Sequence, residues 1–218
     1  LNGFHRFAIL TQAPATQCYA FAGVVAHIHH ITGGVIMAHI KRMMSHDIAA
    51  FDSLAKCGHI SADHFKQVGV GESRIGKYMK DGLIERVSYQ NRDDSGVCYK
   101  LTDEGKDFYF ERTGFKGFYN AQSGAHDLAI ADKYFSLTPD ERESFQTERE
   151  ARSVFREHLD DLRAQGRSQE ADHLSALLKS GQITMPDALY RSGDKLVAFE
   201  VITSSYGRAE IASKEAFV

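Results

Sequence analysis

The chain has 218 residues, of which 25% are charged, with 26 basic and 29 acidic side chains and a formal net charge of −3. This length and ordinary globular composition exclude wholesale disorder and predict two modest domains. Residues 117–218 carry 12 basic and 17 acidic side chains, so the second half is acidic. An acidic half disfavours a surface that coats phosphates there, and any affinity for nucleic acid must come from local basic patches.

The cysteines and the apolar segments indicate the compartment. Cys18, Cys57 and Cys98 are far apart and form no CxxC pair, which favours a reducing cytoplasm. The stretch 19–40 is apolar, but four histidines interrupt it: His27, His29, His30 and His39. We therefore expect a cytoplasmic protein without a membrane partner.

Residues 1–44 are interpreted as an N-terminal arm or helical extension. His27 and His29 would share one face of a strand, as the metal ligands of some single-strand nickases do. Only 26 residues precede His27, which leaves no room for the sheet that such a domain needs. A packed helix or arm is therefore the favoured interpretation.

Residues 45–114 predict three helices, a hairpin and a closing helix. Ser45 is the expected N-cap of the first helix, Ser61 of the second and Thr102 of the last. The third helix is expected over 72–81, and strands over 83–89 and 97–101 flank a polar loop. This is the order of a winged helix-turn-helix, which binds double-stranded DNA.

The third helix carries the expected DNA-reading face. Ile75 and Met79 define its inward direction, which places Ser73, Lys77 and Lys80 on the opposite, exposed face with Arg74 beside them. Arg92, at the tip of the predicted wing, is a candidate minor-groove or phosphate contact, although two aspartates follow it.

Residues 115–218 read as a second α/β domain. A helix is expected from Ala125, and another over 170–178. Between them two interpretations stay open. Either residues 139–166 form one long helix, or residues 144–150 form a strand with Glu148 and Glu150 on one face and the helix is restricted to 152–165.

A predicted hairpin brings two acids together. Residues 185–190 and 196–202 read as strands joined by a Gly193-Asp194 turn. A two-residue turn pairs Ser192 with Lys195 and sets Asp187 opposite Glu200, with β-carbons about 5 Å apart. Like charges at this spacing are best tolerated around a cation, and Mg²⁺ prefers oxygen ligands. The alternative is a longer turn with the acids on opposite faces.

The order of these segments resembles a known family. A winged helix, His126-Asp127 near a helix start, Thr147–Glu150, Pro186-Asp187-Ala188 and Val197–Val201 together resemble the replication-relaxation family and the related MobC-type plasmid mobilization relaxases. The resemblance implies an α+β fold with a winged helix-turn-helix at 45–114 and a restriction-endonuclease-like PD-(D/E)xK domain at 115–218. The latter would be incomplete, because the chain stops at Val218 within a predicted helix.

The resemblance also implies an activity. Glu148 or Glu150, Asp187 and Glu200 would be catalytic acids, and Asp187 with Glu200 would hold Mg²⁺ or Mn²⁺ to nick origin DNA. Ile202 and Ser205 depart from the family pattern, so Lys195 or Lys214 would have to manage the proton. Tyr190 and Tyr206 are candidates for a covalent tyrosine mechanism.

Two other functions stay open. One is a catalytically inactive DNA-binding accessory or replication regulator whose nuclease-like domain dimerises. The other is a winged-helix repressor with an effector pocket. An accessory relaxosome protein and a second copy of the chain are the further partners considered.

Overall fold

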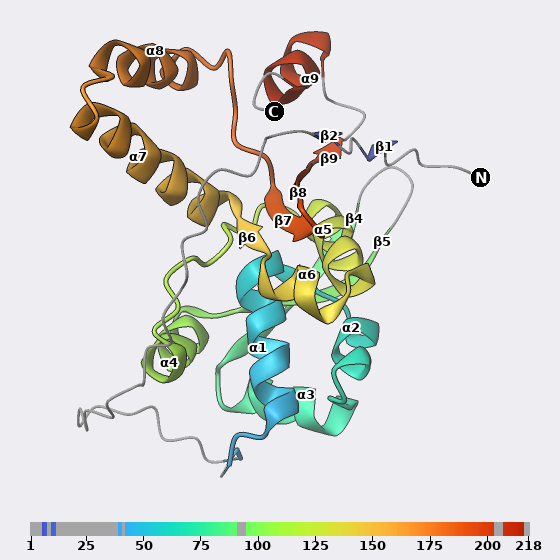
Figure 1. Cartoon of the computed structure of the whole chain (residues 1–218). Coiled ribbons are helices and arrows are strands. Elements are labelled where there is room, and N and C mark those ends of the chain that lie inside the picture. The colour runs from blue at the N-terminus through green and yellow to red at the C-terminus, as the bar shows by residue number, and fades with distance from the viewer. Residues whose placement is uncertain are drawn as a thin grey trace. The chain divides into compact units, whose positions relative to one another are not determined.

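The computed structural model describes residues 6–7, 10–11, 39–40, 42–90, 95–202 and 207–215. Its fold is mixed α+β, as predicted (Figure 1). The chain separates into a central unit, Ala15–Ser136, and a terminal unit, which joins Leu1–Pro14 to Leu137–Val218.

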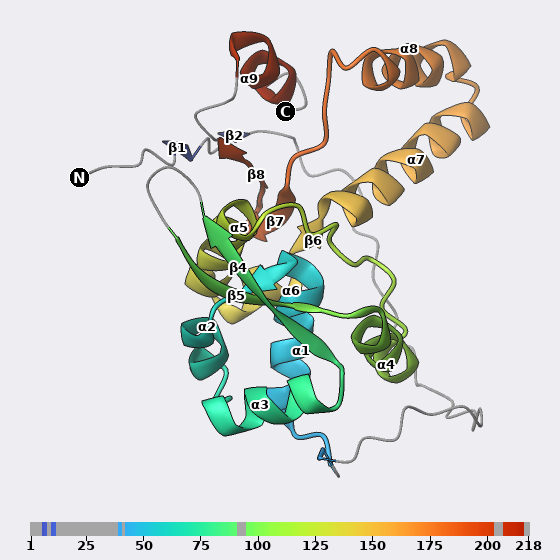
Figure 2. The ribbon, with the colours of Figure 1, turned by 180° about the vertical axis from the view of Figure 1, so that it is seen from behind.

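The central unit contains α1 (Ser45–Cys57), β3 (His59–Ile60), α2 (Ala62–Gln67), α3 (Glu72–Lys80), β4 (Ile84–Gln90), β5 (Ser95–Leu101), α4 (Asp103–Thr113) and α5 (Gly124–Ser136). All but β3 were predicted in this order. The short strand β3 pairs with β5, Ile60 opposite Tyr99, and gives an antiparallel sheet of order β3-β5-β4 (Figure 2).

Local capping explains where the short helices begin. The Ser61 hydroxyl accepts the N–H of His64 at the start of α2, and the Thr102 hydroxyl accepts the N–H of Gly105 at the start of α4. The predicted cap of α1 was wrong by one residue. Met44 is its N-cap, because the Asp47 carboxylate accepts the Met44 N–H at 2.7 Å and closes the first turn.

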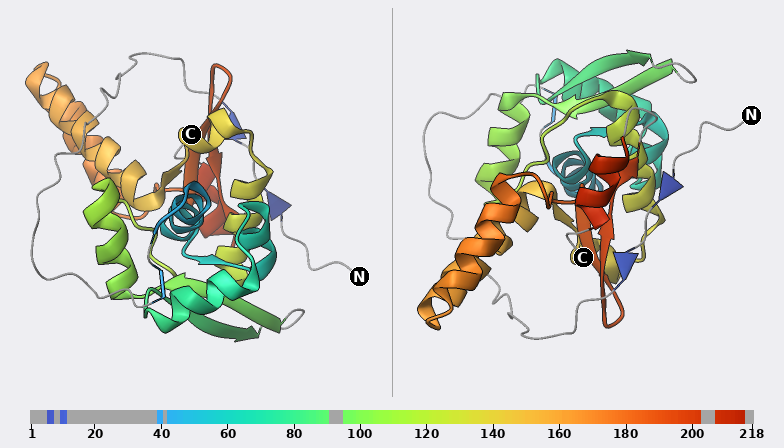
Figure 3. Two further views of the ribbon diagram at one scale, coloured as in Figure 1. Left: turned by 90° about the horizontal axis from the view of Figure 1, so that it is seen from below. Right: turned by 90° about the horizontal axis from the view of Figure 1, so that it is seen from above.

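Helix α1 lies in the middle of the central unit, and Figure 3 shows it end-on among the other helices. It contacts α5, β3 and β5. Its fully buried Phe51 packs edge-on against Tyr78 of α3, with ring centroids 5.2 Å apart. The aromatic core therefore fixes α3 against α1.

A buried histidine–aspartate pair holds α5 in the central unit. Asp127 of α5 is fully buried, and its Oδ2 lies 2.8 Å from Nδ1 of His59 in β3 and accepts the Gln122 N–H at 3.0 Å. The bond to His59 joins segments 68 residues apart. The predicted domain boundary between residues 114 and 115 therefore differs from the observed division after Ser136, since α5 packs with the first sheet.

The terminal unit contains β1 (Arg6–Phe7), β2 (Leu10–Thr11), α6 (Pro139–Glu143), β6 (Gln146–Thr147), α7 (Glu148–Ala164), α8 (Ser168–Lys179), β7 (Ala188–Ser192), β8 (Lys195–Phe199), β9 (Val201–Ile202) and α9 (Arg208–Glu215). Its main sheet is antiparallel with the order β2-β8-β7-β6, and β1 pairs with β9. Residues 6–7 and 10–11, expected in an arm, are therefore strands. The rest of the predicted arm up to residue 38 lies outside the described residues.

Neither interpretation of residues 139–166 was correct in full. A short α6 is followed by the two-residue β6, and α7 then begins at Glu148. The change from strand to helix follows from a capping box, in which Glu150 Oε2 accepts the Thr147 N–H at 2.9 Å and Thr147 Oγ1 accepts the Glu150 N–H at 3.3 Å. Ala151 of α7 then packs with Met185, Leu189 and Ala198 of the sheet region.

Helices α7 and α8 form a hairpin of their own (Figure 1). Leu159 and Leu162 of α7 pack against Ala171 of α8 in a small buried cluster. The chain then returns to β7.

Close packing of Gly105 gives a stability prediction. A β-carbon there would lie 1.9 Å from the carbonyl oxygen of Leu83, so Gly105→Ala should lower the free energy of unfolding by about 1–3 kcal/mol. Gly76→Ala is the matched control. Gly76 is also helical but has no neighbouring atom within 4 Å of an added β-carbon, so alanine there should stabilise by about 0.5–1 kcal/mol. Urea unfolding of both variants measures the difference, and equal effects would contradict the packing.

Candidate functional site

Helix α3 exposes three of the predicted DNA-contacting residues. Ser73, Lys77 and Lys80 are all exposed, while Ile75 is buried as expected. The predicted burial of Met79 was wrong, because Met79 is 38% exposed and Tyr78 is fully buried in its place. Both positions lie near the inward direction that Ile75 sets. Tyr78 takes the core because its ring packs on Phe51 and its hydroxyl reaches a buried acceptor.

That acceptor is Asp47, which also binds Arg74. Arg74 Nε donates to Asp47 Oδ1 at 2.9 Å and Nη2 to Oδ2 at 2.6 Å, while the Tyr78 hydroxyl donates to Oδ1. Asp47 is fully buried. Arg74, expected beside the DNA-reading face, is thus committed to an internal ion pair. We call Asp47, Arg74 and Tyr78 the Asp47 cluster.

The hydrogen bonds of the Asp47 cluster set its protonation. Burial by itself would raise the pKa of Asp47, but the donors Arg74, Tyr78 and the Met44 N–H outweigh it and hold the pKa below its ordinary value. The hydrogen bonds from Arg74 to Asp47 raise the pKa of Arg74. Asp47 and Arg74 are therefore both charged at neutral pH.

Asp47 was not among the predicted residues, although the sequence contains a signal for it. Asp47 lies three, four and seven positions before Ala50, Phe51 and Leu54, which are buried on one stripe of α1. An acid on an apolar stripe needs a buried partner, since an unpaired buried charge is costly. The partner itself is 27 residues away and could not be read from local spacing.

The predicted wing carries two basic residues within its described strands, β4 and β5. Arg92 lies outside the described residues. Arg86 of β4 is exposed, whereas Lys100 of β5 is paired with Glu85 at 3.1 Å.

The predicted register of the second hairpin was correct. Ala188 pairs with Phe199 and Ser192 with Lys195 around the two-residue turn, in which Gly193 has φ +59°. The same register, continued by one residue, places Asp187 opposite Glu200. Both are 4% exposed.

Backbone amides satisfy this acidic pair. Glu200 Oε2 accepts the Asp187 N–H at 3.0 Å, and Asp187 Oδ2 accepts the Val201 N–H at 2.9 Å. The two carboxylates thus make reciprocal bonds between the two segments that continue β7 and β8 just beyond their pairing. We call these two residues the acidic pair.

The structure does not gather the other predicted acids around the pair. Glu148 is the first residue of α7, and its Oε1 accepts from Arg152 Nη2 at 2.7 Å. Glu150 forms the capping box with Thr147. Within the ranges that the structure describes, no group of three or more histidine, cysteine or acidic side chains could hold a metal ion.

The remaining predicted residues are scattered or lie outside the description. Tyr190 is 4% exposed in β7, Ile202 ends β9, Lys195 is exposed beside the turn and Lys214 belongs to α9. Residues 27, 29, 205 and 206 lie outside the described residues, so neither the histidine hypothesis nor Tyr206 is tested.

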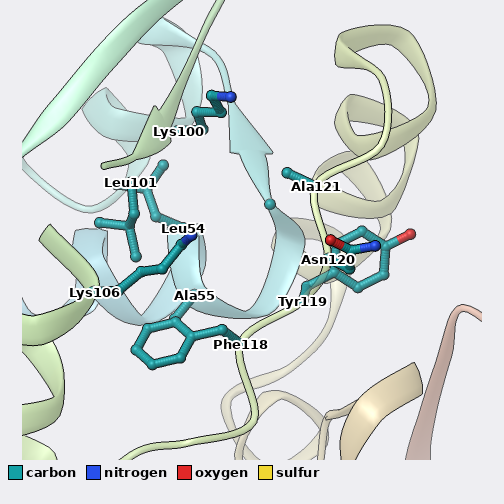
Figure 4. A pocket seen from close by; sticks show the side chains of 10 residues that line it. Leu54, Ala55, Lys100, Leu101, Lys106, Phe118, Tyr119, Asn120 and Ala121 are labelled. Atoms are coloured by element: carbon teal, nitrogen blue, oxygen red, sulfur yellow. The ribbon is translucent and has the colours of Figure 1, made fainter. Parts of the chain in front are cut away.

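A small pocket lies in the central unit between α1, β5, α4 and residues 118–121 (Figure 4). Its volume is about 140 Å³, below the about 300–1,000 Å³ of ordinary ligand sites. Two lysines line it, and both already have partners: Lys106 bonds Asp103 at 2.9 Å and Lys100 bonds Glu85 at 3.1 Å. These features give the effector-pocket hypothesis little support.

Comparison of the chain with protein-family models, curated proteins and solved structures gave no match. Among the helices of the described ranges, none has the length and apolar character needed to cross a membrane.

The Asp47 cluster predicts acid-sensitive stability. Asp47→Asn leaves Arg74 without its buried counter-charge, so the free energy of unfolding should fall by about 3–5 kcal/mol at pH 7. Because folding lowers the pKa of Asp47, its contribution is present above its unfolded pKa of about 3.9 and is lost as the pH falls below it. Urea unfolding of wild type and variant from pH 7 to 3 measures both effects.

Asp63→Asn is the control for this series. Asp63 also bonds a cation, Lys66 at 2.9 Å, but its side chain is 83% exposed. Its replacement should have a much smaller effect at pH 7. Equal losses in the two variants would show that burial of Asp47 contributes nothing.

Proposed function

We propose that the central unit is a winged-helix domain and that the protein binds double-stranded DNA at a plasmid origin, in mobilisation or replication. The order α1, β3, α2, α3, β4, β5 with the sheet order β3-β5-β4 supports the winged helix. The resemblance of the sequence to origin-binding relaxases supports the origin as the target.

The observation that carries this proposal is the distribution of paired and unpaired lysines. Four other lysines of the central unit bond to acids: Lys56 to Asp52, Lys66 to Asp63, Lys100 to Glu85 and Lys106 to Asp103. Lys77 and Lys80 are exposed on one helix, and neither forms an ion pair with a described residue. Cations left without a partner on one face are available to phosphates.

The same observation suits a protein with net charge −3. The whole chain does not attract DNA by its net charge, so binding must depend on this local patch and weaken steeply with salt. Arg74 supports the patch indirectly, because its ion pair with Asp47 holds α3 against α1.

Removing the lysines of α3 tests the proposal. Lys77→Ala and Lys80→Ala should each weaken binding to duplex origin DNA, and each should reduce the slope of log K against log salt by about 1. Neither should unfold the protein, since both side chains point to solvent. Fluorescence anisotropy at several salt concentrations measures affinity and slope. Lys66→Ala, which removes an exposed lysine of α2, is the control, and unchanged slopes in both α3 variants would refute the proposal.

We propose metal-dependent nicking by the acidic pair as the second candidate function. Two adjacent carboxylates are a sufficient protein donor set for Mg²⁺ or Mn²⁺, which often keeps water and substrate phosphates as its other ligands. The bound ion would supply Lewis-acid activation of a phosphate and of water. Burial and the backbone bonds of both acids oppose this function, which is why DNA binding comes first.

Metal binding by the acidic pair is testable without DNA. If the pair holds a metal, Mn²⁺ should raise the melting temperature of wild type relative to EDTA, by mass action on the native state. Asp187→Asn and Glu200→Gln should lose that shift together with nicking of supercoiled origin plasmid. Glu148→Gln, whose acid is bonded to Arg152, should keep both. If the wild type shows neither a Mn²⁺-dependent rise in melting temperature nor nicking, metal-dependent nicking is refuted and only the DNA-binding accessory function remains.

A further inference from the structure

The segment that leads into α1 lies along α3. At the C-terminal end of α3, the carboxylate of Asp81 accepts the His39 N–H at 3.0 Å and the Ile40 N–H at 2.9 Å, and its Oδ1 lies 2.7 Å from the His39 Nδ1. The Ile40 residue is 1% exposed. Residues 39 and 40 are therefore fixed against the end of the proposed reading helix.

Arg74 fixes the same segment near the other end of α3. Its Nη2 donates to the carbonyl oxygen of Arg42 at 2.8 Å while it also bonds Asp47. The two anchors on α3, Arg74 and Asp81, are seven residues apart, or about 10 Å along the helix. Residues 39 and 40 are held at the C-terminal end of α3, and the Arg42 carbonyl lies within reach of the Arg74 side chain. The described residues of this segment are therefore held beside α3.

The guanidinium of Arg42 is available to a ligand. The side chain is exposed and forms no ion pair with a described residue, and the backbone carbonyl accepts the bond from Arg74. Arg42 thus has the property that distinguishes Lys77 and Lys80 from the paired lysines. It comes from a different element, held next to α3 by Arg74.

We propose that Arg42, held beside α3 by Arg74, is a second DNA-contacting element and that it binds a backbone phosphate beside those bound by α3. This inference rests on the proposed DNA binding of α3. A helix in the major groove has a phosphate backbone on each side, so an exposed cation held beside the helix can reach one of those backbones. The partner is the sugar–phosphate backbone of duplex DNA, and the contact carries no sequence preference.

Arg42 variants test the contact. Arg42→Ala should weaken binding about equally for origin and unrelated duplexes and should reduce the salt slope by about 1. Arg42→Lys keeps the charge and should restore the slope. Arg156→Ala removes an exposed arginine of α7 and should change neither quantity. Melting temperatures of all variants, measured in parallel, exclude unfolding as the cause.

The outcomes separate this inference from the function on which it rests. If Lys77→Ala reduces the salt slope and Arg42→Ala does not, α3 binds DNA but the segment does not, and the inference is overturned. If Lys77→Ala, Lys80→Ala and Arg42→Ala all leave the slope unchanged, the proposed function fails as well. A loss at Arg42 that appears only with origin DNA would indicate a base contact and would also overturn the phosphate contact.

Discussion

The arrangement of the proposed reading helix depends on the buried carboxylate of Asp47. It accepts hydrogen bonds from the Met44 N–H at the start of α1 and from Arg74 and Tyr78 on α3. Loss of one partner from such a pair costs about 3–5 kcal/mol, a large part of the stability of a small unit. The interaction also decides which cations remain available. Arg74 is bonded to Asp47 inside the folded unit, whereas Lys77 and Lys80 are exposed to solvent.

Local signals in the sequence predicted the elements, and long-range contacts decided the details that were wrong. The caps Ser61 and Thr102 and the β7–β8 turn act within a few residues, so spacing alone located them. Helical periodicity also placed Ser73, Lys77 and Lys80 outside. It could not choose between Tyr78 and Met79, because that choice depends on Asp47, 31 residues earlier. For the same reason it could not assign α5 to the central unit, which needs His59 and Asp127 to meet across 68 residues.

The acidic pair shows how one correct register supports two chemistries. From the sequence, the two opposed carboxylates were expected to repel each other, and a bound cation would best reduce that repulsion. In the structure, the amides of Asp187 and Val201 donate to the two carboxylates just beyond the β7–β8 pairing. Backbone dipoles also stabilise carboxylates, so burial of the pair does not by itself require a metal. This difference gives a stability measurement with Mn²⁺ more weight than the geometry alone.

If an acidic protein binds DNA, it does so through few cations, so the arrangement of these cations matters more than their number. Four lysines of the central unit form ion pairs with neighbouring acids, while Arg42, Lys77 and Lys80 form none with a described residue. Arg74 and Asp81 hold residues 39, 40 and 42 against α3, so Arg42, Lys77 and Lys80 are borne by two elements that are already fixed to each other. In the proposed complex less ordering would be required on binding, which would raise the affinity obtained from each phosphate contact.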